Sequence, residues 1–227
     1  MRAIIIGANG GIGSAFVTLL TDRHGAESVV GLSRSSGEID LSDEASIAEA
    51  AARFAQLPSP DLVIVATGML HDGARGPEKS LRELDAAWLA KNYAVNVIGP
   101  ALVAKHFLPL FARDARGVFA VLSARVGSIS DNRIGGWYGY RAAKAALNMT
   151  IKNLAIEWGR THKQGVCVGL HPGTVDTGLS KPFQKNVAPE KLFTPARSAA
   201  AMLGVLDGLT PADSGKCFAW DGVEILP

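Results

Sequence analysis

Cysteine is scarce in this sequence. The two residues of this type, Cys167 and Cys217, lie far apart along the chain, and each stands in an apolar run. Such residues are usually buried, and they behave as small hydrophobic side chains. We therefore expect two buried free thiols, which fit the reducing conditions of the cytoplasm.

An excess of charge of one sign is also missing. The chain has 23 Lys and Arg against 21 Asp and Glu, a formal net charge of +2, so composition gives no electrostatic reason to expect nucleic acid or a membrane as partner. No apolar run approaches the ~18 residues of a transmembrane helix, and the apolar run in MRAIIIGANGG is too short for a signal peptide. A cytoplasmic protein is expected, and no metal site is predicted.

Short apolar runs alternate with helical patterns along the chain. Strands are predicted at 3–6, 28–32, 62–68, 117–122, 165–170 and 216–220, with a short additional strand at 38–41. Helices are predicted at 15–25, 43–56 with Ser42 as N-cap, 81–111 with a kink at Pro100, from Tyr140 onward, and 195–209. Segments 69–80 and 178–193 are predicted as a surface loop and a mobile loop. The alternation predicts a single α/β domain over 1–227, a Rossmann-type doubly wound parallel sheet with helices on both faces.

Four glycines, Gly7, Gly10, Gly11 and Gly13, stand between the first strand and the first helix. Glycine lets the backbone come close to a pyrophosphate, and the start of a helix offers free N–H groups to it. The spacing is G-x-x-x-G-x-G rather than the commoner G-x-G-x-x-G. Strand, glycine turn and helix together predict a dinucleotide-binding loop.

The end of the second strand carries Ser33, Arg34 and Ser35, and no acidic residue follows until Glu38. An acidic residue in this region usually binds the ribose 2′-hydroxyl of NAD. An arginine with neighbouring hydroxyls suits the oxygens of a 2′-phosphate instead. The sequence therefore favours NADP(H) over NAD(H).

Tyr140 stands four residues before Lys144 in WYGYRAAK, at the start of an alanine-rich helical segment. Residues at this spacing share a helix face, with Cβ atoms roughly 5–6 Å apart. A nearby ammonium group lowers the pKa of a phenol from its usual value near ~10. A tyrosine with a lowered pKa can act as a general acid or base. An ordinary helix surface can also carry this pair, so the rest of the chain must decide.

Further polar residues stand where a ligand would bind. Asn96 lies inside an apolar helical stretch and is either a structural hydrogen-bonding residue or a site residue. Ser123 and Ser128 lie in the loop after the strand at 117–122, and loops beyond the carboxyl ends of parallel strands bind ligands in open α/β sheets.

Taken together, the motifs resemble those of the short-chain dehydrogenase/reductase family over essentially the whole chain. The stretch from Ser123 to Met149 and the ending FAWDG are similar to the C-factor-like branch, which itself resembles small carbonyl reductases. The matching pieces are Gly7-x-x-x-Gly11-Ile12-Gly13, Asp40-Leu41, Ala66-Thr67-Gly68, Asn96, the loop from Ser123, Tyr140-x-x-x-Lys144 and Pro172-Gly173-x-Val175-x-Thr177.

The resemblance implies roles for the matching positions. Tyr140 would pass a proton to or from the substrate oxygen, Lys144 would lower its pKa and hold the nicotinamide ribose, and Asn96 would support a water relay behind Lys144. The implied cofactor contacts are Gly7, Asn9, Gly11, Ile12 and Gly13 at the pyrophosphate, Asp40 and Leu41 at the adenine, Ala66 and Gly68 at the adenosine ribose, and the Pro172 to Thr177 motif, with Val175 and Thr177 at the amide, around the nicotinamide. The cofactor itself would supply the hydride.

Three positions depart from the family pattern. Ile6 stands where threonine usually opens the glycine motif, and Val65-Ala66-Thr67-Gly68 replaces Asn-Asn-Ala-Gly. The family's second loop serine, which is normally catalytic, is Ala124 here. Ser123 or Ser128 could replace it, and we favour Ser123. Loss of a single oxyanion donor costs roughly 10²–10³ in rate.

Two functions follow from this reading. The first is an NADP-dependent oxidoreductase acting on a small carbonyl or alcohol substrate, with Trp137, Tyr138, Leu179 and Phe183 lining a partly apolar pocket. The second is a dinucleotide-binding signalling protein of C-factor type with little catalysis, which Ala124 would explain. The family resemblance also implies a homodimer or homotetramer.

Overall fold

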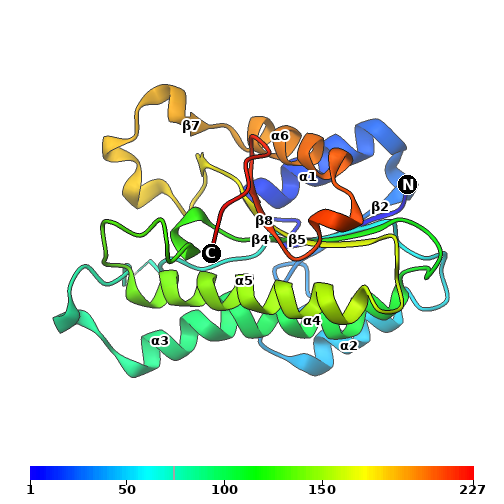
Figure 1. Cartoon of the computed structure of the whole chain (residues 1–227), viewed down its shortest axis with the longest axis horizontal. Helices are drawn as coiled ribbons and strands as arrows, with labels where there is room; N and C mark the ends of the chain where they lie inside the picture. Colours follow the sequence, from blue (N-terminus) through cyan, green and yellow to red (C-terminus); the bar gives the residue numbers. More distant parts are fainter. Residues whose placement is uncertain (74) are drawn as a thin grey trace.

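A computed structural model describes residues 1–73 and 75–227, and its main feature is a parallel sheet between two layers of helices (Figure 1). The six strands lie in the order β2-β1-β3-β4-β5-β8, and neighbouring strands in this order are parallel. The strands are β1 (Ala3–Ile6), β2 (Val29–Leu32), β3 (Leu62–Val65), β4 (Gly117–Leu122), β5 (Gly165–His171) and β8 (Cys217–Ala219). The predicted doubly wound α/β fold is confirmed.

Helices cover both faces of the sheet. One face packs against α1 (Gly11–His24) and α6 (Pro195–Gly208), which lie together above the sheet in Figure 1. The other face packs against α2 (Glu44–Ala52), α4 (Gly99–Phe107) and α5 (Tyr138–Trp158), and α3 (Ala86–Tyr93) lies in the same layer. The strand residues are almost all fully buried, as expected for a sheet that is covered on both sides.

The additional strand predicted at 38–41 is wrong. Its backbone groups are used by a turn and by side chains rather than by a neighbouring strand. The Glu38 N–H donates to Ser33 O at 3.1 Å, and the Asp40 N–H donates to Ser46 Oγ at 2.9 Å. Residues 33–42 therefore form a turn beyond the end of β2 and not a further strand of the sheet.

Two other predicted elements differ in detail. Helix α2 begins at Glu44 and is capped by Asp43, whose Oδ1 accepts from the Ala45 N–H, so Ser42 is not the N-cap. The single helix predicted at 81–111 is interrupted by the π-helical segment Ala94–Ile98, directly ahead of Pro100. Because Pro100 has no N–H to donate, the chain widens there instead of continuing as a regular helix.

Both loops that border the carboxyl edge of the sheet are more ordered or more buried than expected. The loop at 69–80, of which residue 74 lies outside the described residues, buries Met69, Leu70 and Glu78. The segment predicted as mobile at 178–193 contains the 3₁₀ turns Lys181–Asn186 and Pro189–Lys191 and the short strand β7 (Leu192–Phe193). Strand β7 pairs with β6 (Thr174–Val175) in a separate two-stranded sheet.

Candidate active site

The glycine turn after β1 forms a closely packed cradle. Gly7 has a positive φ of 89°, and a Cβ atom on Gly13 would lie 2.1 Å from the Gly7 carbonyl oxygen. A Cβ atom on Gly11 would lie 2.6 Å from Thr177 Cγ2. Side chains at these positions would force the turn apart. Gly10 begins α1, and no side chain in the described residues caps the first N–H groups of this helix, which can therefore bind an anion.

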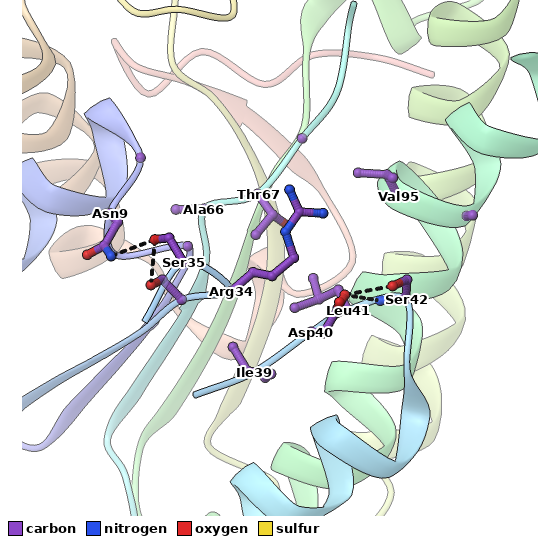
Figure 2. Close-up of a pocket in the computed structure, with 15 residues that line it drawn as sticks. Asn9, Arg34, Ser35, Ile39, Asp40, Leu41, Ser42, Ala66, Thr67 and Val95 are labelled. Carbon is purple, nitrogen blue, oxygen red and sulfur yellow. Dashed lines mark hydrogen bonds between the residues drawn. The ribbon is translucent and has the colours of Figure 1, made fainter. Parts of the chain in front are cut away.

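A cleft of about 440 Å³ lies between this turn and the end of β2 (Figure 2). It brings together eight residues that the sequence predicts for the cofactor, namely Gly7, Asn9, Ser33, Arg34, Asp40, Leu41, Ala66 and Gly68. Gly10, from the predicted dinucleotide-binding loop, and Ser35, expected near a 2′-phosphate, also line this cleft. The sequence did not indicate the remaining lining residues, Ile39, Ser42, Thr67, Ala94 and Val95.

Serine hydroxyls hold the turn from which Arg34 extends. Asn9 Nδ2 donates to Ser35 Oγ at 2.8 Å, and Ser35 Oγ lies 3.2 Å from Ser33 Oγ. Figure 2 shows Arg34 between this turn and the segment that carries Asp40. The Ser42 hydroxyl and backbone N–H bind the Asp40 carboxylate and lower its pKa, and the charge of Arg34 lowers it further.

A second cleft of about 380 Å³ continues from the first. The two share Gly10, Ala66, Thr67 and Gly68, so one long ligand can occupy both. The second cleft brings together Gly11, Ile12, Ser123, Tyr140, Lys144, Pro172 and Thr177 from the predicted site. Four other predicted residues do not line either cleft: Gly13 packs beneath Gly7, Gly173 packs against Phe193, Val175 is buried in β6, and Asn96 is buried behind Gly68.

Tyr140 and Lys144 lie side by side on the buried face of α5. Lys144 Nζ is 5.7 Å from the centroid of the Tyr140 ring and donates to the Leu122 carbonyl oxygen at 2.8 Å. Burial lowers the pKa of Lys144 to about 8. Burial also raises the pKa of Tyr140 above its ordinary value, so the expected lowering by Lys144 is not found in the protein alone.

The described residues fit a dinucleotide. The glycine cradle leaves room only for backbone, and the free N–H groups at the start of α1 face the place where the clefts meet. Thr67 Oγ1, at that junction, is buried without a hydrogen-bond partner in the described part of the chain. A bound ligand with phosphate and ribose oxygens would match these groups.

Comparison with known proteins then decides the family. The family model described as enoyl-(acyl carrier protein) reductase matches residues 8–219 of this chain. The chain belongs to the short-chain dehydrogenase/reductase family. The resemblance inferred from the sequence motifs is therefore confirmed, and the chain is an NAD(P)-dependent oxidoreductase by family.

Relatives of this short-chain dehydrogenase/reductase differ in the functions that their names describe. The C-signal of Myxococcus xanthus is 35% identical over 154 residues, which cover 67% of this chain and 87% of that protein. The 1-hydroxy-2-glutathionyl-2-methyl-3-butene dehydrogenase of Rhodococcus sp. is 30% identical over 232 residues, or 96% of each chain. The structure of NADPH-bound carbonyl reductase from chicken fatty liver has a TM-score of 0.83 and 24% identity, and it covers 100% of this chain and 98% of that one. At this identity the structural likeness shows the shared fold.

Asn96 holds a loop of this short-chain dehydrogenase/reductase. Its Nδ2 donates to Met69 O at 2.9 Å, and its Oδ1 accepts from the Met69 N–H at 3.1 Å. A Cβ atom on Gly68 would lie 3.5 Å from Asn96 Oδ1 and 3.8 Å from Lys144 Nζ. Asn96 is thus a structural hydrogen-bonding residue that also lies close to Lys144.

The two loop serines differ in position. Ser123 lines the second cleft, and its hydroxyl donates to Asn148 Oδ1 at 2.6 Å. Ser128 does not line that cleft, and its Oγ accepts from the Asp131 N–H at 3.1 Å within its own loop. Ala124, at the family's serine position, packs in a small apolar cluster with Leu70 and Tyr140.

One residue at the rim of the second cleft, His71, was not predicted from the sequence. His71 lines the second cleft, and its Nε2 lies 3.0 Å from Gly178 O, which joins the loops after β3 and β6. Its ring is 6.0 Å from that of Phe183, and the Phe183 ring is 5.1 Å from that of Trp137. A histidine in a polar loop gives no periodic pattern, so only the folded structure brings it to the cleft.

Burial of Lys144 gives the protein a testable pH dependence. Its folded pKa of about 8 lies below the ordinary 10.5, so between these values the unfolded chain binds more protons and stability rises with pH. The free energy of unfolding of the wild type, minus that of Lys144→Met, should increase by roughly 3 kcal/mol from pH 8 to pH 10.5. Urea unfolding at a series of pH values measures this difference, with the exposed Lys152→Met as matched control. A difference that stays flat or falls would contradict the burial effect.

Proposed function

We propose that this protein is an NADP(H)-dependent reductase of small carbonyl compounds. The observation that carries the proposal is the buried pair of Tyr140 and Lys144 in a cleft that continues the glycine cradle. The reductases and dehydrogenases among the relatives support it. Hydride would pass from the cofactor to the carbonyl carbon, and a proton would pass from Tyr140 to the carbonyl oxygen.

The electrostatics leave Tyr140 in the form that can act as the proton donor. Burial raises the pKa of Tyr140, which keeps the phenol protonated near neutral pH. A protonated phenol is the form that donates a proton to a carbonyl oxygen during reduction. Lys144 would hold the nicotinamide ribose and bring positive charge beside the phenolate that remains. Asn96 would support a water relay behind Lys144, because both lie next to Gly68.

The cofactor would lie along the two clefts. Its pyrophosphate would meet the free N–H groups at the start of α1, its adenosine half would lie against Asp40 and Leu41, and its nicotinamide half would reach Tyr140. The residues proposed for its binding are Gly7, Asn9, Gly11, Ile12, Gly13, Ser33, Arg34, Asp40, Leu41, Ala66, Gly68, Tyr140, Lys144, Pro172, Gly173, Val175 and Thr177.

Further observations support the proposed domain organisation, cellular location and oligomeric state. The match over residues 8–219 supports a single domain, and the buried free thiols support a cytoplasmic location. Met149 and Ile156 are exposed on α5, which supports a homodimer or homotetramer. No helix in the described ranges is long and apolar enough to cross a membrane.

A second function is a dinucleotide-binding signalling protein with little catalysis. Two observations favour it: Ala124 removes the family's serine, and the C-signal of Myxococcus xanthus is a relative. Turnover across a broad panel of aldehydes, ketones and alcohols separates the two functions. Tight NADPH binding with no turnover on any of them would favour the signalling protein.

Tyr140→Phe tests the central proposal. The variant keeps the aromatic ring and removes the proton donor, so NADPH should bind with a Kd within about 3-fold of wild type while kcat falls by roughly 10³-fold or more. Fluorescence titration gives Kd, and oxidation of NADPH followed at 340 nm gives kcat. Turnover retained by the variant would rule out Tyr140 as the acid.

Ser123 is proposed as the substitute oxyanion donor, because it lines the cleft that holds Tyr140 and Ser128 does not. A substrate oxygen must compete with Asn148 for its proton. Ser123→Ala should lower kcat by roughly 10²-fold. Ser128→Ala is the matched control and should leave kcat within about 2-fold of wild type, since its hydroxyl stays within its own loop. The reverse order of the two effects would assign the role to Ser128.

Arg34→Ala tests the choice of cofactor. Loss of a charge-assisted contact to the 2′-phosphate should raise KM for NADPH by roughly 10- to 100-fold and leave KM for NADH nearly unchanged. Steady-state kinetics with both cofactors measure the ratio, and Arg160→Ala, an exposed arginine just after α5 that lines neither cleft, serves as control. An equal rise in KM for NADH would show that Arg34 does not contact the 2′-phosphate.

A further inference from the structure

Glu78 is a buried carboxylate outside the residues that line the two clefts. Only 1% of its surface is exposed, although it belongs to a segment predicted as a surface loop. Within residues 1–73 and 75–227 no lysine, arginine or histidine forms an ion pair with it. Burial of an acidic side chain is costly unless its oxygens accept hydrogen bonds. Its partners therefore indicate why it is buried.

Both partners of Glu78 belong to the start of α5. Its Oε2 accepts from the Gly139 N–H at 3.1 Å, and its backbone oxygen accepts from the Trp137 N–H at 2.5 Å. Trp137 is the N-cap residue of α5, has a left-handed φ of 50°, and provides no side-chain cap among the described contacts. Glu78 therefore supplies from a distant loop the acceptor and the negative charge that a helix N-terminus requires.

The turn that Glu78 holds is the turn that carries Tyr140. Tyr140 follows Gly139 directly, and its ring lies 6.4 Å from the ring of Trp137 in a T-shaped contact. The fit around Glu78 is close, because a Cβ atom on Gly139 would lie 2.9 Å from Glu78 Oε1. Any shift of Glu78 would therefore move the first turn of α5, and Tyr140 with it.

We infer that Glu78 is a positioning residue for Tyr140, acting through the backbone of the first turn of α5. The inference rests on the proposed reductase function and deepens it. Glu78 touches neither cleft, so its removal should lower kcat while leaving NADPH binding nearly intact. A displacement of about 1 Å at a reacting group can cost on the order of 10²-fold in rate.

The surroundings of Glu78 provide a conservative replacement. Glu78 Oε1 and Asn92 Oδ1 are both buried without a hydrogen-bond partner in the described part of the chain. A Cβ atom on Gly139 would lie 2.9 Å from Glu78 Oε1 and 3.4 Å from Asn92 Cγ. The Glu78 carboxylate and the Asn92 amide therefore face the same space beside Gly139. Glu78→Gln keeps one oxygen for the Gly139 N–H and places an amide N–H₂ group near the oxygen of Asn92.

The experiment compares three variants with wild type. Glu78→Ala should lower kcat by roughly 10- to 100-fold with Kd for NADPH within about 3-fold, and Glu78→Gln should restore kcat to within about 3-fold of wild type. Asp85→Ala is the matched control, because Asp85 caps α3 in the same way, through the Trp88 N–H at 2.8 Å, without touching α5. It should lose comparable stability and keep kcat.

Two outcomes would overturn the inference: a loss of kcat in Glu78→Gln as large as in Glu78→Ala, or an equal loss in Asp85→Ala at equal stability. If Glu78→Ala does not fold, Glu78→Asp replaces it, since the shorter side chain withdraws the oxygen from Gly139. Its kcat should fall as well, and an unchanged kcat would contradict the positioning role.

A readout without turnover separates this inference from the proposed function. Amide hydrogen exchange of the first turn of α5, at Trp137 and Gly139, should be faster in Glu78→Ala and near wild type in Glu78→Gln. If the wild type turns over no carbonyl compound but the variants show this exchange pattern, the proposed function is wrong. The inference that Glu78 positions the first turn of α5 would then still be supported. Unchanged exchange in Glu78→Ala would overturn the inference itself.

Discussion

The site depends on one buried contact, the hydrogen bond from Lys144 Nζ to the carbonyl oxygen of Leu122. Leu122 is the last residue of β4, and Lys144 lies on α5, so the bond joins this helix to the carboxyl edge of the sheet. The surrounding burial is what lowers the pKa of Lys144 and raises that of Tyr140. The same packing that holds the pair in place therefore also sets the protonation states available for chemistry.

The sheet order explains where the clefts open. β1 lies between β2 and β3, so the chain leaves β1 toward one side of the sheet and later crosses to the other. In open α/β sheets the loops separate at such a point and leave a crevice at the carboxyl ends of the strands. The glycine turn after β1 and the segment Ala66 to Gly68 after β3 border this crevice, and both clefts meet there.

The apolar cluster around Tyr140 is a second consequence of the packing. Ala124 takes the place of a hydroxyl beside Tyr140, and Leu70, Val126, Trp137 and Phe183 complete the cluster. Such surroundings disfavour a phenolate and favour a protonated Tyr140. A protonated Tyr140 is the form that the proposed reductase requires, and in that proposal Ser123, whose hydroxyl donates to Asn148 Oδ1, would orient the carbonyl oxygen.

The sequence alone predicted the six strands of the main sheet, the glycine turn and the Tyr140–Lys144 pair, because each depends on a pattern within a few residues. It could not show that the segment at 38–41 has no strand partner, that Asp43 rather than Ser42 caps α2, or that Glu78 is buried against α5. Nor could it show that burial, rather than the charge of Lys144, sets the direction of the Tyr140 pKa shift. Those features were decided only by the tertiary structure, since hydrogen-bond partners and desolvation come from residues that are distant along the chain.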